Sequence, residues 1–580
     1  MFKKFNIDNS TKFVYSFMLN KKQYILAFIL FTGINIFFNI LEPQFAKALI
    51  DKSLNSSYTN QVLFLGIIWI AMFITKYISK YTFQYLSLKF KIMVFGDIQK
   101  HLFNHILKLP MSYFQQNSPA YIVSRQFDDV FGIEGLMISN VIEGLFSILQ
   151  FIVILIIMFK YSFWLAIISL ILIISDIIIS FSFPLKKLYK SHNEASAIVK
   201  KELTNSFQGI KLIKISAKVS SEMKRNHQFL KQYFAALDKR DTINIVRNIS
   251  SNFLKNISTP IIVIIGVFLL YTNSITVGTI TLFLIYFNKL SQAFTPAMNL
   301  IPLFKISKAS AERLYEIINI QPEENNLNYS KVTPISHINT IEFKDISFHY
   351  EDNINILHKL NFKIEKNQFV AFVGQSGSGK TSIIKLLLKL FRPSNGSIYI
   401  NGININLIDT KALRKSISYV DQHAFLFNRS LYENLIYSST NSISKDLLTN
   451  YLSELSLDYL ISSLHNGLDT MINEDSSNLS GGEKQRLSII RELLKESDVL
   501  ILDEYTASLD SITENKIHNK LRELAKNKTI IIIAHKLSTI KNADKIYVLD
   551  NGLVIESGNH NELMALKGKY YNLYVNQQNY

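Results

Sequence analysis

The stretch Phe369-Val-Ala-Phe-Val-Gly374-Gln-Ser-Gly377-Ser-Gly379-Lys380-Thr381 decides the fold of the second half of this chain. Its first five residues form an apolar run typical of a buried strand, and residues 382–390 are compatible with an apolar helix. A strand, a turn of the form GxxxxGK[ST] and a helix together make a phosphate-binding loop. The spacing therefore predicts that the chain binds a nucleoside triphosphate.

The residue types in this loop suit a polyphosphate. Glycines let the backbone N–H groups turn toward the anion, and the positive end of the helix dipole adds to the attraction. Lys380 is placed to reach the β- and γ-phosphates, and the Thr381 hydroxyl to bind Mg²⁺. We expect the nucleotide to contact Gly374, Gln375, Ser376, Gly377, Ser378, Gly379, Lys380, Thr381 and Ser382.

Charge and hydrophobicity divide the 580 residues into two different halves. Residues 341–580 contain 27 Lys and Arg against 27 Asp and Glu, whereas residues 1–340 contain 35 against 18, which accounts for the whole formal charge of +17. The basic residues lie between long apolar runs, which is typical of a membrane protein and not of a nucleic-acid binder. The absence of cysteine excludes disulfides, zinc–thiolate sites and cysteine nucleophiles.

Six apolar segments predict an all-α membrane domain over residues 1–320. Each is near or above the roughly 20 residues that a spanning helix needs; they lie at 24–50, 61–84, 137–159, 162–182, 255–273 and 277–304. Short links follow the first, third and fifth segments, and long basic links follow the second and fourth. The positive-inside rule places the long links and both termini in the cytoplasm of a bacterial cell. Residues 321–340 are polar and contain Pro322 and Pro334, which predicts a linker.

Asp176 is the most isolated charge among these apolar segments, inside Ile171-Leu-Ile-Ile-Ser-Asp-Ile-Ile-Ile. A carboxylate in hydrocarbon is costly, so Asp176 is expected to face a bundle interior or an aqueous cavity, where it would meet substrate. The alternative is that Asp176 lies near the inner headgroups or pairs with a lysine.

Two further strands of the predicted α/β domain, residues 341–580, end in polar groups. The run Asp498-Val-Leu-Ile-Leu-Asp503-Glu504 ends in two acids: Asp503 is suited to hold Mg²⁺, and Glu504 to deprotonate the attacking water. The run 529–534 leads into His535, which is placed to bond the γ-phosphate. Ser480-Gly481-Gly482 opens another helix and makes a second anion site, which we expect to address nucleotide on another copy of the domain.

The set and order of these motifs resemble the ATP-binding-cassette family. The matching segments are GQSGSGKTS, Gln422 in Tyr-Val-Asp-Gln-His, LSGGEKQR, LILDE, Ser508-Leu-Asp510 and AHKLSTI. Because six membrane segments precede them in one chain, the protein resembles an exporter-type half-transporter. The resemblance implies a six-helix transmembrane domain followed by an ABC-type P-loop ATPase domain that uses ATP and Mg²⁺.

The same resemblance implies roles for particular residues. Tyr350 stacks on adenine, Gln422 approaches Mg²⁺ and senses the membrane domain, and Asp510 lies across a dimer interface. Ser480, Gly481 and Gly482 cap the γ-phosphate held by the opposite subunit, and His535 supports hydrolysis. Phe114 with residues 118–125, and residues 208–214, are similar to the two coupling regions of the family. The chain departs from the family at Ala120, Asn473, Ser476, Glu483 and 505–507.

The segment Leu479–Arg486 is called the signature segment below, and the helix that it opens the signature helix. One phosphate loop and one signature helix per chain predict a head-to-tail dimer that encloses two ATP molecules. A homodimer is expected and a heterodimer stays open. The mechanism expected is ATP-driven export by alternating access, with a small peptide or a hydrophobic compound as substrate and membrane lipid around the helices. A lipid flippase and an ATP-gated channel share every motif and stay open as alternatives.

Overall fold

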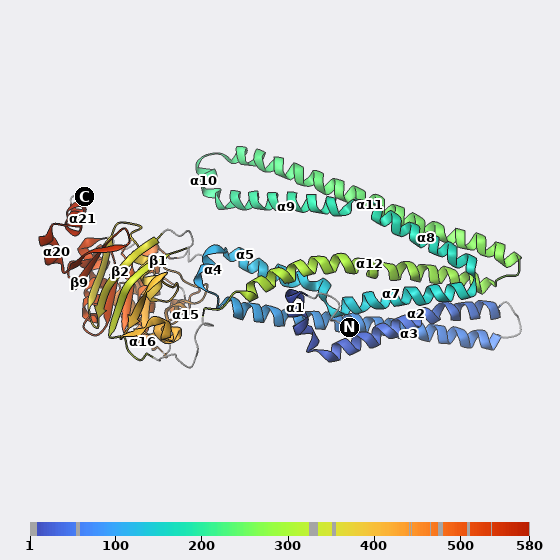
Figure 1. Ribbon diagram of the computed structural model, residues 1–580, viewed down its shortest axis with the longest axis horizontal. Helices are drawn as coiled ribbons and strands as arrows, with labels where there is room; N and C mark the ends of the chain where they lie inside the picture. The colour runs from blue at the N-terminus through green and yellow to red at the C-terminus, as the bar shows by residue number, and fades with distance from the viewer. Residues whose placement is uncertain are drawn as a thin grey trace. The chain divides into compact units, whose positions relative to one another are not determined.

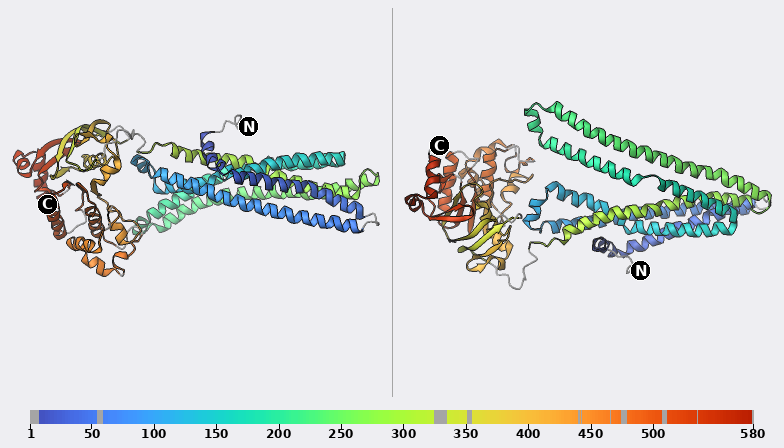
Figure 2. Two further views of the ribbon diagram at one scale, coloured as in Figure 1. Left: turned by 90° about the horizontal axis from the view of Figure 1, so that it is seen from below. Right: turned by 45° about the horizontal axis from the view of Figure 1, so that its top comes forward.

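The computed structural model describes residues 8–578 with the exception of 54–58, 324–334, 351–354, 440, 442, 465, 474–478, 507–510 and 535 (Figures 1 and 2). Its contacts divide the chain into two compact units. The first contains Met1–Ile106 and Ala120–Ile320, and the second Leu107–Pro119 and Gln321–Tyr580. The boundaries at 320 and 340 stay predictions, because much of the expected linker lies outside the described residues.

The first unit is built from helices. Its described elements are α1 (Asn9–Leu19), α2 (Lys22–Ser53), α3 (Thr59–Ile106), α5 (Pro119–Ser124), η2 (Arg125–Asp129), α6 (Val130–Gly132), η3 (Ile133–Leu136), α7 (Ile138–Tyr161), α8 (Phe163–Ser182), α9 (Leu185–Gln208), α10 (Ile210–Ile215), α11 (Val219–Tyr271) and α12 (Val277–Asn319). The six predicted apolar segments fall on α2, α3, α7, α8, α11 and α12. The all-helical membrane fold is therefore confirmed.

Length and hydropathy mark four stretches of the described chain as sufficient to cross a membrane. They are Lys22–Ser53, Val62–Ile106, Pro119–Tyr161 and Val219–Tyr271. The apolar part of α8 is shorter, at Phe163–Ile179. A helix of about 20 residues already spans roughly 30 Å, the thickness of the hydrocarbon core.

Three helices are much longer than a bilayer requires: α3 has 48 residues, α11 has 53 and α12 has 43. Only part of each is apolar, so the remainder extends the helix beyond its apolar segment. Figure 1 shows α8 and α9 lying along α11, with the short α10 at the end of this hairpin. It also shows α2, α3, α7 and α12 running together.

The described part of the second unit contains two sheets. A four-stranded antiparallel sheet has the order β2-β1-β4-β5, and a six-stranded, mostly parallel sheet has the order β10-β9-β3-β8-β7-β6. The strands are β1 (Thr340–His349), β2 (Asn355–Glu365), β3 (Phe369–Gly374), β4 (Asn395–Ile400), β5 (Ile403–Asn404), β6 (Ile417–Val420), β7 (Val499–Asp503), β8 (Thr529–Ile533), β9 (Lys545–Asp550) and β10 (Leu553–Gly558). The continuous apolar run 369–373 is explained by its central place, because β3 is covered on both faces.

Helices cover the parallel sheet on both sides and complete the predicted α/β domain. They are α13 (Lys380–Leu387), η5 (Ile405–Leu407), α14 (Thr410–Lys415), α15 (Leu431–Leu435), α16 (Lys445–Glu454), α17 (Asp458–Ser463), η6 (Gly467–Asp469), α18 (Gly481–Leu493), α19 (Ser511–Leu524), η8 (Leu537–Ile540), α20 (His560–Leu566) and α21 (Lys569–Gln578). The segment Leu107–Pro119 with α4 (Met111–Gln116) also belongs to this unit, and Glu323 N donates to Lys108 O at 2.8 Å.

Candidate nucleotide-binding site

The ends of four neighbouring parallel strands lie at one edge of the six-stranded sheet. Register pairs Val420 with Leu502, Asp503 with Ile533, and Phe372 with Ile533, so β6, β7, β8 and β3 end side by side. Loops that follow such strand ends form the crevice where open α/β sheets bind ligands. The phosphate loop, the two acids and the segment before His535 all start from this edge.

The phosphate loop has the backbone shape that its glycines permit. Gly379 is the N-cap of α13 and has a φ of 99°, in the left-handed region that side chains disfavour. A Cβ atom on Gly374, whose φ is 154°, would lie 2.2 Å from Leu549 O. Both positions therefore require glycine, one for its conformation and one for the close approach of β9.

The side chain of Lys380 points back to the phosphate loop that precedes it. Its Nζ donates to Gly374 O and Gln375 O, both at 2.9 Å, and only 5% of the residue is exposed. Burial lowers the pKa of Lys380, while the charges of Glu504 and Asp503 act to raise it. The ammonium group therefore already stands inside the cradle where phosphate oxygens are expected.

Asp503, at the end of β7, is almost completely buried, with 1% exposure. Tyr419 donates its hydroxyl to Oδ2 at 3.4 Å, Thr381 contributes a side-chain hydrogen bond, and Oδ1 is buried without a hydrogen-bond donor. Burial raises the pKa of Asp503 to about 6, and the neighbouring Glu504 and Asp421 charges add to this. A buried oxygen with no donor beside a threonine hydroxyl fits Mg²⁺, which prefers oxygen ligands.

Glu504 follows Asp503 with an unusual backbone. Its φ of 47° lies in the left-handed region, and its N–H donates to Ile533 O at 3.0 Å. The Gln422 amide donates Nε2–H to Glu504 Oε2. Such strained residues persist only where the surroundings fix them, and they cluster at active sites. The structure thus brings Gln422, Glu504, Asp503, Thr381 and Lys380 together.

Tyr350 lies one residue beyond β1, next to the phosphate-loop helix. Its ring packs edge-on against Phe348 and Phe391, with centroid distances of 4.8 and 5.1 Å, and Lys385 Nζ lies 5.6 Å from the ring centre. Its hydroxyl lies 3.3 Å from Ser382 Oγ. The ring is therefore fixed beside the nucleotide loop, while stacking on a base stays a prediction.

The signature segment opens α18 with a capping box. Ser480 is the N-cap: its Oγ accepts from Glu483 N at 3.3 Å, and Glu483 Oε2 accepts from Ser480 N at 2.6 Å. Within the described part of the chain, no hydrogen bond or ion pair joins Ser480, Gly481 or Gly482 to the phosphate loop. Asp510 and His535 lie outside the described residues, so their predicted roles stay predictions.

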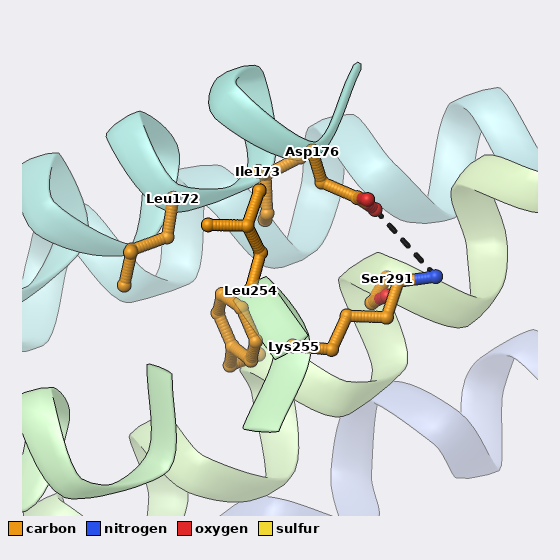
Figure 3. Close-up of a pocket in the computed structure, with 7 residues that line it drawn as sticks. Leu172, Ile173, Asp176, Leu254, Lys255 and Ser291 are labelled. Carbon is orange, nitrogen blue, oxygen red and sulfur yellow. Dashed lines mark ion pairs between the residues drawn. The ribbon is translucent and has the colours of Figure 1, made fainter. Parts of the chain in front are cut away.

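Asp176 lies on α8 beside α11, in the first unit (Figure 3). Ser251 donates its hydroxyl to Oδ1 at 2.5 Å, and Lys255 Nζ lies 3.5 Å from Oδ2. The carboxylate is therefore paired with a lysine, as one of the sequence-based alternatives states. A small pocket next to the pair is lined by Leu172, Ile173, Leu254, Phe287 and Ser291. Contact of Asp176 with substrate stays a prediction.

A second charged cluster in the membrane helices was not predicted from the sequence. Glu42 on α2 accepts from Lys76 Nζ of α3 at 3.0 Å and from Lys289 Nζ of α12, and Lys289 also donates to Asn39 Oδ1 at 3.1 Å. Lys289 is 7% exposed. The signal available in the sequence was a lysine inside the apolar run 277–304, which on its own does not reveal a partner 247 residues away.

Known proteins match both halves of the chain. The model of the ABC transporter transmembrane region matches residues 24–294, and the ABC transporter model matches residues 357–507. An "ATP-dependent lipid A-core flippase" of Desulfotalea psychrophila is 30% identical over 539 residues, covering 92% of this chain and 93% of the relative. The flippase of the same name from Escherichia coli (strain UTI89) is 30% identical over 577 residues, covering 95% of each chain. An "uncharacterized ABC transporter ATP-binding protein YfiC" of Bacillus subtilis is 28% identical over 574 residues, covering 97% of this chain and 93% of the relative.

Among solved structures, a bacterial Atm1-family ABC exporter with ATP bound matches with a TM-score of 0.80. The match covers 96% of this chain and 98% of that chain at 22% identity, so it concerns the fold. The relatives, the two family models and the site at the sheet edge agree with one another. The chain therefore belongs to the ABC transporter family, as a multi-pass membrane half-transporter of the exporter type that carries its transmembrane region and its ATP-hydrolysing domain in one polypeptide.

Proposed function

We propose that two copies of this chain form a transporter in which ATP drives an amphipathic, lipid-like compound across the bilayer. The observation that carries the proposal is the meeting of Lys380, Asp503, Gln422 and Glu504 at one sheet edge, in a chain that also supplies the membrane helices. The protein then resides in the bacterial cytoplasmic membrane, with both termini and the ATPase domain in the cytoplasm.

ATP binding begins at the phosphate loop. Entry of the polyphosphate replaces the Gly374 and Gln375 carbonyls as partners of Lys380, and the backbone N–H groups of residues 375–382 bind the phosphate oxygens. Thr381 and Asp503 would hold Mg²⁺, and the Gln422 side chain would approach it. When bound, Mg²⁺ neutralises charge on the β- and γ-phosphates. Tyr350 supports the adenine ring.

Hydrolysis requires a base for the attacking water. Glu504 takes this role, since its carboxylate stands next to Asp503 at the end of β7. Gln422 donates to Oε2 of the same carboxylate in this structure, which places its amide directly beside the proposed base. Gln422 would therefore stand next to both the base and the residues that would hold Mg²⁺. His535 supports the γ-phosphate.

Dimerisation explains the signature segment. Ser480, Gly481 and Gly482 form a helix N-terminus suited to phosphate, and among the described residues no hydrogen bond or ion pair joins them to the phosphate loop of their own chain. A second copy, placed head to tail, brings this N-terminus to the γ-phosphate, and Asp510 lies at the shared interface. A homodimer is the simplest arrangement, because this chain contains both halves of the site.

Two features of the helical unit support an amphipathic substrate. The clusters Asp176–Lys255 and Glu42–Lys76–Lys289 put charges inside the apolar segments of their helices, where a molecule with a polar head and an apolar body would find partners for both. The names of the relatives, which describe lipid flippases, support a lipid over a peptide. Residues 118–125 with Phe114, and residues 208–214, which cover most of α10, carry the motion of the ATPase domain to these helices.

The test uses the full chain in proteoliposomes. We expect ATP-dependent movement of a fluorescent lipid between leaflets and stimulation of ATP hydrolysis by lipids above that by peptides or dyes, with the Glu504→Gln variant as the inactive control. Stimulation by peptides alone would replace the lipid with a peptide substrate, and ionic current without strict coupling to ATP would indicate a channel.

A further inference from the structure

The N-terminus of α18 carries a negative charge at the place where an anion is expected to bind. Glu483 occupies the third position of the helix, and its Oε2 accepts from the backbone N–H of Ser480 at 2.6 Å. A carboxylate stabilises an empty helix N-terminus by its interaction with the dipole. The same carboxylate opposes the approach of a phosphate, because the two charges have the same sign.

Tyr459 of α17 binds the other oxygen of this carboxylate. Its hydroxyl donates to Glu483 Oε1 at 2.7 Å and accepts from Arg486 Nη2 at 3.1 Å. A tyrosine hydroxyl has one proton, and a guanidinium has no acceptor, so the direction of both bonds is determined. The series of hydrogen bonds from Arg486 to Tyr459 to Glu483 therefore draws the negative charge of the carboxylate away from the N-terminus of α18.

The Arg486 guanidinium, at the start of this series of hydrogen bonds, is itself held in place. The residue is 8% exposed, and its Nη1 donates to Leu455 O at 3.2 Å and to Ser456 O at 2.9 Å, while Nε donates to Gly482 O at 3.3 Å. A planar guanidinium held by four acceptors has little freedom to move. The Tyr459 hydroxyl is consequently fixed by its bond to Arg486, although about half of the Tyr459 surface is exposed (52%).

The arrangement also determines which way Ser480 presents its hydroxyl. Ser480 Oγ accepts from Glu483 N at 3.3 Å, so the oxygen lone pair faces the helix and the hydroxyl proton remains to be donated outward. A serine in this orientation donates to a phosphate oxygen without leaving its capping position. The Glu483 carboxylate fixes the backbone of the same residue, because its Oε2 accepts from Ser480 N.

From these contacts we infer that Tyr459 is a positioning residue: acting through Glu483, it keeps Ser480 oriented toward the γ-phosphate of the ATP bound to a second copy of this chain and turns the Glu483 charge away from that phosphate. The inference rests on the proposed function, because it assumes that the signature helix meets nucleotide in trans. It assigns to α17 a part in ATP-driven closure that none of the sequence motifs contains.

The experiment measures closure of the two ATPase domains as a function of ATP concentration. The chain contains no cysteine, so a single introduced cysteine on each copy carries a spin label, and the distance between the two labels reports closure in full-length protein in nanodiscs. The Glu504→Gln background prevents turnover. Steady-state kcat and KM for ATP are measured separately in the chain with Glu504 intact.

Tyr459→Phe removes the hydroxyl and keeps the ring. We expect the ATP concentration for half-maximal closure and the KM to rise about 3- to 5-fold, the size of one exposed charged contact, while the melting temperature stays within 1 °C or so of the parent. In Tyr459→Phe the Glu483 carboxylate has lost its hydroxyl partner and keeps its negative charge. Adding Glu483→Gln removes that charge, so the double variant is expected to match Glu483→Gln alone. Tyr451→Phe, on the neighbouring helix α16, is the matched control and is expected to match the parent.

Several results would overturn the inference. One is a Tyr459→Phe variant that closes at the parental ATP concentration, and another is a defect that Glu483→Gln does not relieve. A fall in melting temperature that accounts for the whole defect would assign Tyr459 a structural role only. Failure of the proposed function looks different, because the parent itself would then show no ATP-dependent change in the distance between the labels.

Discussion

Replacing Asp503 with asparagine is expected to stabilise the ATPase domain while it abolishes Mg²⁺-dependent hydrolysis. Burial raises the pKa of this carboxyl from 3.8 to about 6, which corresponds to about 3 kcal/mol at 1.36 kcal/mol per pKa unit. The folded state therefore binds the proton more tightly than the unfolded state. Stability from this group is fully present below about pH 4 and is lost as the pH rises toward 6.

The asparagine variant has no such loss, because its side chain does not ionise. Its advantage over the parent without Mg²⁺ is expected to be about 3 kcal/mol at pH 7.5 and about half of that at pH 5. For a domain of this size, 1 kcal/mol corresponds to roughly 2–4 °C, so the melting temperature at pH 7.5 should rise by about 6–12 °C. Magnesium with ATP should stabilise the parent and not the variant, because the variant has lost the carboxylate ligand.

Differential scanning calorimetry of the full chain in nanodiscs, with EDTA and then with Mg²⁺ and ATP, measures these differences. Asp446→Asn, which removes an exposed carboxylate from the same domain, is the control and is expected to change stability by less than about 0.5 kcal/mol. An advantage of Asp503→Asn that is the same at pH 5 and pH 7.5 would refute the assigned cause. A variant less stable than the parent at pH 7.5 would do so as well.

Three further substitutions test the other parts of the site. Lys380→Ala should lose most ATP binding, because the ammonium within the loop is its main positive charge; near-normal binding of a fluorescent ATP analogue would contradict this role. Glu504→Gln should bind ATP, stay closed and release phosphate at less than about 1% of the parental rate; phosphate release at the parental rate would exclude Glu504 as the base. Asp176→Asn should alter transport in proteoliposomes more than basal ATP hydrolysis, since its partners Ser251 and Lys255 belong to the membrane unit, and equal effects on both would favour a structural role.

Local sequence was sufficient for the strand, loop and helix around Lys380. Those elements depend on residues that are neighbours in the chain, and their apolar runs and glycines specify the conformation directly. The strand that ends at Asp503 was predicted for the same reason. The helical segments of the first unit followed from their length and hydropathy.

Contacts between residues far apart in the sequence could not be predicted from local sequence. The bond between Gln422 and Glu504, and the pair of Lys289 with Glu42, depend on how separate elements pack, and no spacing in the sequence encodes that. The same holds for Tyr459, whose partner Glu483 was noted only as a departure from the family. The grouping of Leu107–Pro119 with the second unit also arises from packing and not from composition.

The left-handed backbone of Glu504 constrains which amino acids evolution and mutagenesis are able to place there. Residues branched at Cβ are penalised in this conformation, so valine, isoleucine and threonine damage the domain in addition to removing the base. Asparagine, aspartate and glycine tolerate the same angles, so a saturation library selected only for protein abundance should retain them and deplete the branched residues. Abundance selection would then reveal the geometry of this position independently of its chemistry.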